Sequence, residues 1–155
     1  MNMENLLKYL TIACFLLSIS ACAGLQKQQQ SFNVSGQVFE HKYNSMPQVG
    51  VSSKKGSPLA TTIYIYAPTK IQQLGDLNGA YCGEINNTFI ASFVSDSLGY
   101  FKTKLNNGKY SVFVKYDNKY YVPYFSGAEW ASIFEVKLKD ATELTINVYS
   151  ATNNQ

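Results

Sequence analysis

The chain has 155 residues, of which 46% are apolar and 15% are charged, as is typical of a single globular domain. Twelve Tyr, nine Phe and one Trp supply the surface of a hydrophobic core, so the composition excludes an extended disordered protein. All thirteen basic side chains are Lys, and with ten acidic side chains they leave a formal net charge of +3. The sequence has no Arg, the side chain whose planar fork reads phosphates and bases, which argues against a nucleic-acid partner.

Residues 1–21 have the pattern of a signal peptide, which we expect to be helical. Lys8 precedes an apolar run from Tyr9 to Ile19, far shorter than the ~20 residues that cross a bilayer as a helix. The run ends in Ile19-Ser20-Ala21-Cys22, which resembles the lipobox of bacterial lipoproteins. The resemblance implies cleavage before Cys22 and attachment of three acyl chains, palmitate among them, to that residue. The alternative is an ordinary secretory signal that is cut after Ala21 and leaves Cys22 without a lipid.

A lipid on Cys22 would make the mature protein a peripheral, membrane-tethered component of the cell envelope. Residues 22–31 contain four Gln and no aromatic residue, so we expect a flexible tether there, and a disordered tail at residues 151–155. Ala23 stands where some bacteria place an acidic residue that retains lipoproteins in the inner membrane. This favours the outer membrane and leaves open whether the domain faces the periplasm or the cell surface.

Between residues 32 and 150, apolar and polar side chains alternate in short runs separated by turn residues, the pattern of β-strands. We expect strands with inward side chains at Val34 and Val38, Ile63 and Ile65, Phe101 and Leu105, Val112 and Val114, Phe134 and Val136, and Ile146 and Val148. A seventh strand, Phe89 to Val94, is apolar nearly throughout, so its inner face is not assigned. The expected turns are Asp96-Ser97-Leu98-Gly99, a hairpin at Asn106-Asn107-Gly108, and Lys139-Asp140-Ala141. The pattern predicts one all-β domain, a seven-stranded antiparallel sandwich.

Four blocks of this sequence are similar to the carboxypeptidase regulatory-like domain, a transthyretin-like Greek-key sandwich. They are residues 34–38 with Gly36, residues 56–65, the Asp96 to Phe101 segment, and residues 107–112 with Gly108 and Tyr110. The blocks occur in the order of that family. Two segments are longer than in typical members, Glu40 to Lys55 and Ala67 to Asn86, and we expect any function particular to this chain to lie there.

The side chains offer little for catalysis. The enzymatic branch of the transthyretin-like fold, the 5-hydroxyisourate hydrolases, uses several His, an Arg and a C-terminal Tyr-Arg-Gly-Ser, whereas this chain has one His and no Arg. We therefore expect no enzyme, no cofactor and no metal, with Asp76, Glu84 and Glu129 as scattered solvated acids. The alternative is a hydrolase that uses Cys82 or His41, although Cys82 has no second Cys for a redox pair and is more often a packed residue in such a position.

Aromatic side chains suggest a binding surface. The candidate binding residues are Tyr120, Tyr121, Tyr124, Phe125 and Trp130, which crowd one connection, and Tyr64, Tyr66 and Phe113 are expected off the core faces. The alternative is that the same rings fill the open end of the sandwich. Asp96-Ser97-Leu98 is similar to an O-glycosylation acceptor of exported bacterial proteins, which makes Ser97 a candidate modification site.

Taken together, these patterns predict a non-catalytic envelope lipoprotein whose domain binds or scaffolds a protein or a carbohydrate. The alternative is an accessory subunit of an outer-membrane transporter or peptidase system.

Overall fold

The structure, a computed structural model, describes residues 30–43, 56–137 and 141–151, and 67% of them lie in strands. Their only helical turn is the 3-10 turn η2 (Ile71–Gln73), and no helix among them is long and apolar enough to cross a bilayer. The expected signal peptide, Cys22 and most of the tether lie outside these residues, as do residues 44–55, 138–140 and 152–155. The expectation of an all-β domain is confirmed, with several antiparallel sheets.

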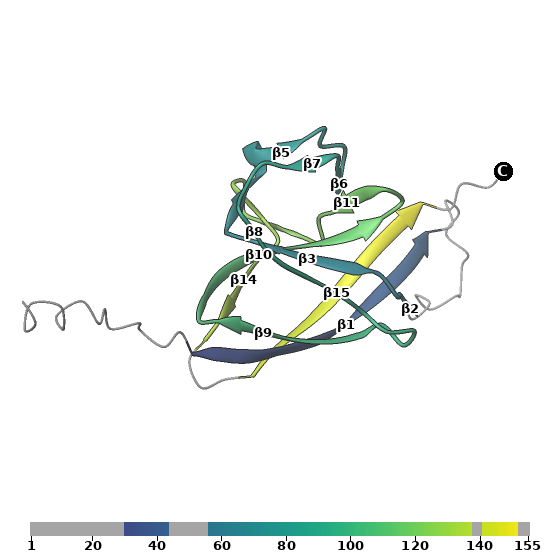
Figure 1. The fold of residues 1–155 in the computed structure, drawn as a ribbon. Helices are drawn as coiled ribbons and strands as arrows, with labels where there is room; N and C mark the ends of the chain where they lie inside the picture. The colour runs from purple at the N-terminus through teal and green to yellow at the C-terminus, as the bar shows by residue number, and fades with distance from the viewer. Residues whose placement is uncertain (1–29, 44–55, 138–140, 152–155) are drawn as a thin grey trace, which may run out of the picture.

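Two main sheets enclose the core (Figure 1). The first sheet contains β15 (Thr142–Ala151), β1 (Ser31–Tyr43), β2 (Ser57–Pro58) and β9 (Tyr100–Asn106). The second contains β6 (Tyr81–Cys82), β11 (Lys119–Tyr121), β10 (Gly108–Tyr116), β3 (Thr62–Tyr66), β8 (Phe89–Val94) and β14 (Ile133–Val136). Each of the seven expected strands corresponds to one of these, namely β1, β3, β8, β9, β10, β14 or β15. The pairing of β1 with β15 is parallel, so the expectation of a wholly antiparallel arrangement is wrong for this pair.

The core lies between the inner faces of the two sheets. Val34, Val38, Ile146 and Val148 come from the first sheet, and these four side chains are at most 2% exposed. They pack against Tyr110 and against six residues of the second sheet that were expected to point inward: Ile63, Ile65, Val112, Val114, Phe134 and Val136. The alternation of apolar side chains therefore predicted the inner faces correctly, because each of these strands does bury one face.

Two of the expected turns connect the sheets to each other. The Asp96 turn forms as expected, with the Gly99 N–H donating to the Asp96 carbonyl at 2.9 Å, but it leads from β8 in the second sheet to β9 in the first. Asn106 and Asn107 lead back from β9 to β10. The expected hairpin at Asn106 to Gly108 is therefore wrong, since β9 pairs with β1 and β10 pairs with β3, β11 and β14. Turn residues fix a reversal of the chain but not the sheet that the next strand joins.

A second hydrophobic cluster covers the outer face of the second sheet. Its buried members are Tyr66, Leu74, Cys82, Phe113, Val122 and Ala131. The Phe113 ring points away from the main core, as expected, but it is fully buried because the second cluster covers it. The cover comes from the segment expected as a long loop, Ala67 to Asn86, and from residues 122–131. These residues form small sheets: β4 (Thr69–Lys70) with β13 (Trp130–Ala131) and β12 (Phe125–Ser126), and β5 (Leu74–Gly75) with β7 (Glu84–Ile85).

Candidate binding surface

The five candidate binding residues do not form one cluster. Tyr121 is 2% exposed and belongs to the main core. Its hydroxyl oxygen accepts the backbone N–H of Tyr149 at 3.1 Å, which links β11 to β15 across the sandwich. Tyr120 is half-buried against the second cluster, where its ring meets the edge of Tyr64 with centroids 5.2 Å apart. These two rings are therefore part of the packing, Tyr121 in the main core and Tyr120 on the second cluster.

Tyr124, Phe125 and Trp130 lie on the β12–β13 hairpin, which we call the aromatic hairpin (residues 124–131). Tyr124 is 40% and Phe125 is 41% exposed, and Trp130 is half-buried. Trp130 pairs with Ser126, one position after Phe125, so Phe125 and Trp130 leave opposite faces of the hairpin. The hairpin thus carries aromatic surface on both of its faces.

Polar contacts hold the aromatic hairpin in place. The Tyr124 hydroxyl donates to the Ile133 carbonyl at 2.7 Å, and the Tyr124 N–H donates to the Ser132 hydroxyl at 3.2 Å. Beside β13, the ammonium of Lys70 on β4 lies 5.3 Å from the centre of the Trp130 ring and forms an ion pair with Glu129. Because a ring that is already fixed loses little side-chain entropy on binding, this arrangement suits a preformed recognition surface.

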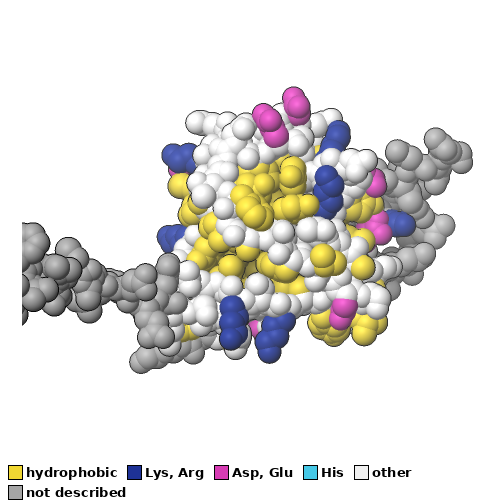
Figure 2. Space-filling model, in the orientation of Figure 1, with side chains coloured by type: hydrophobic (Ala, Val, Ile, Leu, Met, Phe, Trp, Pro, Cys, Tyr) yellow, Lys and Arg dark blue, Asp and Glu magenta, His cyan; other side chains and the backbone are white. Residues whose placement is uncertain are grey.

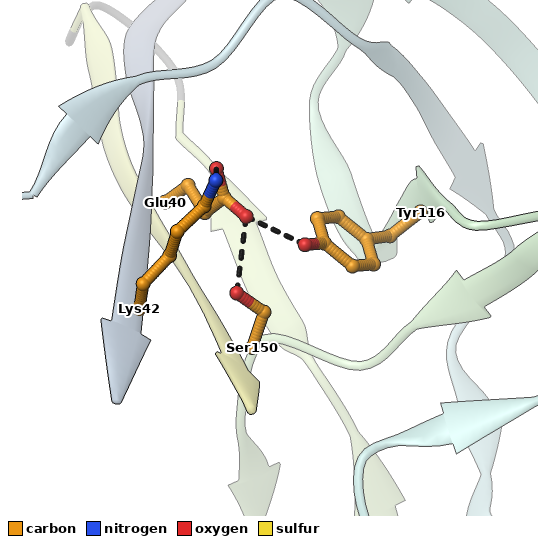
Figure 3. Close-up of polar contacts among 4 residues, drawn as sticks. All are labelled: Glu40, Lys42, Tyr116 and Ser150. Carbon is orange, nitrogen blue, oxygen red and sulfur yellow. Dashed lines mark hydrogen bonds and ion pairs between the residues drawn. The ribbon is translucent and has the colours of Figure 1, made fainter. Parts of the chain in front are cut away.

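A polar cluster joins the two sheets at another place, where β1, β15 and β10 meet (Figure 3). Glu40 Oε1 accepts hydrogen bonds from the Tyr116 hydroxyl at 2.5 Å and from the Ser150 hydroxyl at 3.0 Å, and Lys42 lies 3.7 Å from Glu40 Oε2. Burial raises the pKa of Glu40. The hydrogen bonds from Tyr116 and Ser150 and the charge of Lys42 lower it by more than burial raises it, so the pKa is below its ordinary value of 4.5. Such a carboxylate is a weak base with satisfied oxygens, so the cluster is suited to structure more than to proton transfer.

The Glu40 cluster is not among the sites that were expected from the sequence. Glu40 stood at the start of an expected loop, whereas β1 continues to Tyr43 and carries the Glu40 side chain toward the second sheet. The alternation along β1 was the signal that could have found it, because Glu40 follows Val34 and Val38 at even spacing.

Cys82 and His41, the candidates of the hydrolase alternative, lie apart in the fold. Cys82 is fully buried in the second cluster, and burial raises the pKa of its thiol to about 11. The thiolate that a nucleophile needs is therefore scarce at neutral pH. His41 Nε2 lies 3.0 Å from Asn147 Oδ1, and its ring packs on Tyr149 with centroids 4.9 Å apart.

The remaining candidate residues are on the surface. Within the described ranges, no group of three His, Cys, Asp or Glu side chains lies close enough together to hold a metal ion. Ser97 is exposed in the turn that Asp96 organises, where Asp96 Oδ1 accepts the backbone N–H groups of Leu98 and Tyr100. The turn explains Asp96 without a glycan and leaves Ser97 accessible.

No protein-family model matches the chain, and no curated protein matches it.

Proposed function

We propose that this protein is a non-catalytic lipoprotein of the cell envelope whose β-domain binds a protein or a carbohydrate. The observation that carries the proposal is the exposure of Tyr124 and Phe125 on a hairpin fixed by hydrogen bonds. Exposed rings on a fixed backbone are the surface from which hot spots of protein interfaces and stacking platforms for sugars are built. The burial of Cys82 and the satisfied hydrogen bonds of Glu40 support a role without catalysis.

The membrane anchor rests on the lipobox-like Ile19-Ser20-Ala21-Cys22. The tether that follows it leads to β1, which begins at Ser31, so the domain would start ten residues or fewer from the lipid. Mass spectrometry of the mature N-terminus tests the anchor. We expect a peptide that begins with a triacylated Cys22, and a peptide that begins with unmodified Cys22 or with Ala23 would contradict the proposal.

We further propose that the sandwich is transthyretin-like and related to the carboxypeptidase regulatory-like domain. Support comes from the positions of the four sequence blocks, which fall on β1, on β2 and β3, on the turn before β9, and on the start of β10. A Cβ at Gly36 would collide with the backbone carbonyl of Leu144 on β15, which accounts for the glycine of the first block. An experimental structure whose strand connections depart from the Greek key would contradict this assignment.

Binding can be tested on chains that lack the lipid, so that the anchor does not mask the interaction. The chain from residue 22 onward with Cys22→Ala, which lacks both the lipid and the apolar run from Tyr9 to Ile19, should bind saturably to isolated cell envelopes. Binding that is lost after protease treatment of the envelopes identifies a protein partner, and binding that survives protease but is lost after glycan digestion identifies a carbohydrate. Absence of saturable binding to untreated envelopes would contradict the proposal.

A further inference from the structure

The edge strand β8 exposes several large apolar side chains. β8 pairs with β3 on one side, and within the described residues no strand pairs with its other side. Phe89 is 52%, Ile90 is 42% and Val94 is 66% exposed on this strand. In the sequence its continuous apolar pattern prevented assignment of an inner face, and the reason is now evident, because both faces of β8 are partly open. Figure 2 shows hydrophobic side chains gathered on the face turned to the viewer, below the β5–β7 pair.

Other sheet edges carry charges that discourage pairing with a further strand. β9, at an edge of the first sheet, carries exposed Lys102 and Lys104, and β15, at the opposite edge, carries exposed Glu143. From Asn86 to Ser95 the chain has neither a charged residue nor a proline. Natural proteins protect exposed edge strands with charged residues and prolines. Because β8 has neither, we expect another strand to cover its edge.

The hydrogen-bonding phase of β8 shows which backbone groups are open. The Ser95 N–H donates to the Thr61 carbonyl at 2.9 Å, so Ser95, Phe93 and Ala91 turn their backbone groups toward β3. By the same alternation, Ser92 and Val94 turn theirs toward the open side, and both side chains are exposed. Ile90, at the irregularity between the Ala91 and Phe89 pairings, has no Cα partner on β3. The open side of β8 therefore offers a short antiparallel ladder.

We propose that β8 pairs with β8 of a second copy of this chain, antiparallel and about a two-fold axis at Ser92. In this register Ser92 lies opposite Ser92 of the second copy, and Val94 lies opposite Ile90 of the second copy. Both exposed aliphatic side chains then gain an apolar neighbour, and no charge of either strand enters the ladder. A shift of the axis to Phe93 would instead set Ile90 opposite Asp96, so the register at Ser92 is favoured. The second sheet of one copy and the second sheet of the other copy would then form one continuous sheet.

Site-directed crosslinking in cells that make the full chain tests this pairing. Ser92→Cys places two thiols across the proposed axis, where the ~5.5 Å between the Cα atoms of a hydrogen-bonded pair permits a disulfide. The matched control is Thr145→Cys, an exposed position on β15 of the other sheet, and the unmodified chain reports any background from its own cysteines. We expect a crosslinked species of twice the chain mass for Ser92→Cys, about tenfold more abundant than for Thr145→Cys.

A second substitution separates pairing from chance collision. Ser92→Cys with Val94→Lys should lose the crosslink, because in each copy the introduced lysine would face Ile90 of the other copy, two residues from the axis. Ser92→Cys with Thr145→Lys should keep it. Equal crosslinking of Ser92→Cys and Thr145→Cys, or a crosslinked species of another mass, would overturn the proposal. This outcome is independent of envelope binding by the aromatic hairpin, which lies on different strands.

Discussion

The hydroxyl of Tyr121 on β11 accepts the backbone N–H of Tyr149 on β15 at 3.1 Å. Tyr81, next to β11 on β6, donates its hydroxyl to the carbonyl of the same Tyr149, also at 3.1 Å. Two side chains of the second sheet thus bind both backbone groups of one residue in the first sheet. The rings of Tyr81 and Tyr121 meet at 5.2 Å between centroids, which fixes the two hydroxyls relative to each other.

Removal of the Tyr121 hydroxyl tests this link. Tyr121→Phe should lower the free energy of unfolding by about 1 kcal/mol, because it leaves a partly buried N–H without this acceptor while the ring keeps its packing. Tyr121→Ala should cost about 3–5 kcal/mol, since it removes a core ring. Urea denaturation measures both. The matched control is Tyr124→Phe, where the ring is 40% exposed and water can replace the lost donor, so a cost equal to that of Tyr121→Phe would count against the account.

The Glu40 cluster predicts a dependence of stability on pH. Because the pKa of Glu40 is below 4.5 in the folded chain, its ionised form stabilises the fold above that pH, and this contribution is lost as the pH falls through the folded pKa. Glu40→Gln keeps the size of the side chain but cannot titrate. The difference in unfolding free energy between the two proteins should therefore shrink as the pH falls from 6 to about 3. A difference that stays constant over this range would contradict the assignment of Glu40.

Gly36 is predicted to resist even the smallest substitution. A Cβ at this position would meet the Leu144 carbonyl oxygen, which is backbone held in the parallel β1–β15 pairing and cannot rotate away. Gly36→Ala should lower the unfolding free energy by about 3 kcal/mol or more, at the upper end of overpacking costs. The control is Gly83→Ala, where a Cβ would lie 3.1 Å from the flexible end of Asp76. Thermal melts of the two variants should differ by several degrees.

The Cys82 thiol should be inert in the folded protein. With full burial and a pKa of about 11, only a small fraction of the thiol is ionised at pH 8 and reagent cannot reach it. Peptide mapping after alkylation should find Cys82 unmodified in the native state and modified after denaturation in urea. Rapid native labelling would revive the hydrolase alternative.

The sequence predicted those parts of the fold that depend on one strand at a time. The inner faces of β1, β3 and β10 follow from alternation, because the side chains of a strand alternate between the two faces of a sheet whichever strands pair with it. The second cluster could not be predicted, because the cover of Phe113 comes from segments far away in the chain. The separation of Tyr121 from Tyr124 could not be predicted either, since both rings stand in one run and only the path of the chain after Val122 divides them.

This separation decides how the proposed function is tested, because removal of the buried Tyr121 ring would lower the stability of the domain rather than report on binding. The most direct measurement is the affinity of the Cys22→Ala chain for isolated cell envelopes, compared with the same chain carrying Tyr124→Ala and Phe125→Ala. We predict a loss of affinity of at least about tenfold, or ~1.4 kcal/mol, with little change in the melting temperature. Leu98→Ala, which removes another exposed apolar side chain, should bind as the parent does. Equal affinity of the parent and the double variant would contradict the role of the aromatic hairpin.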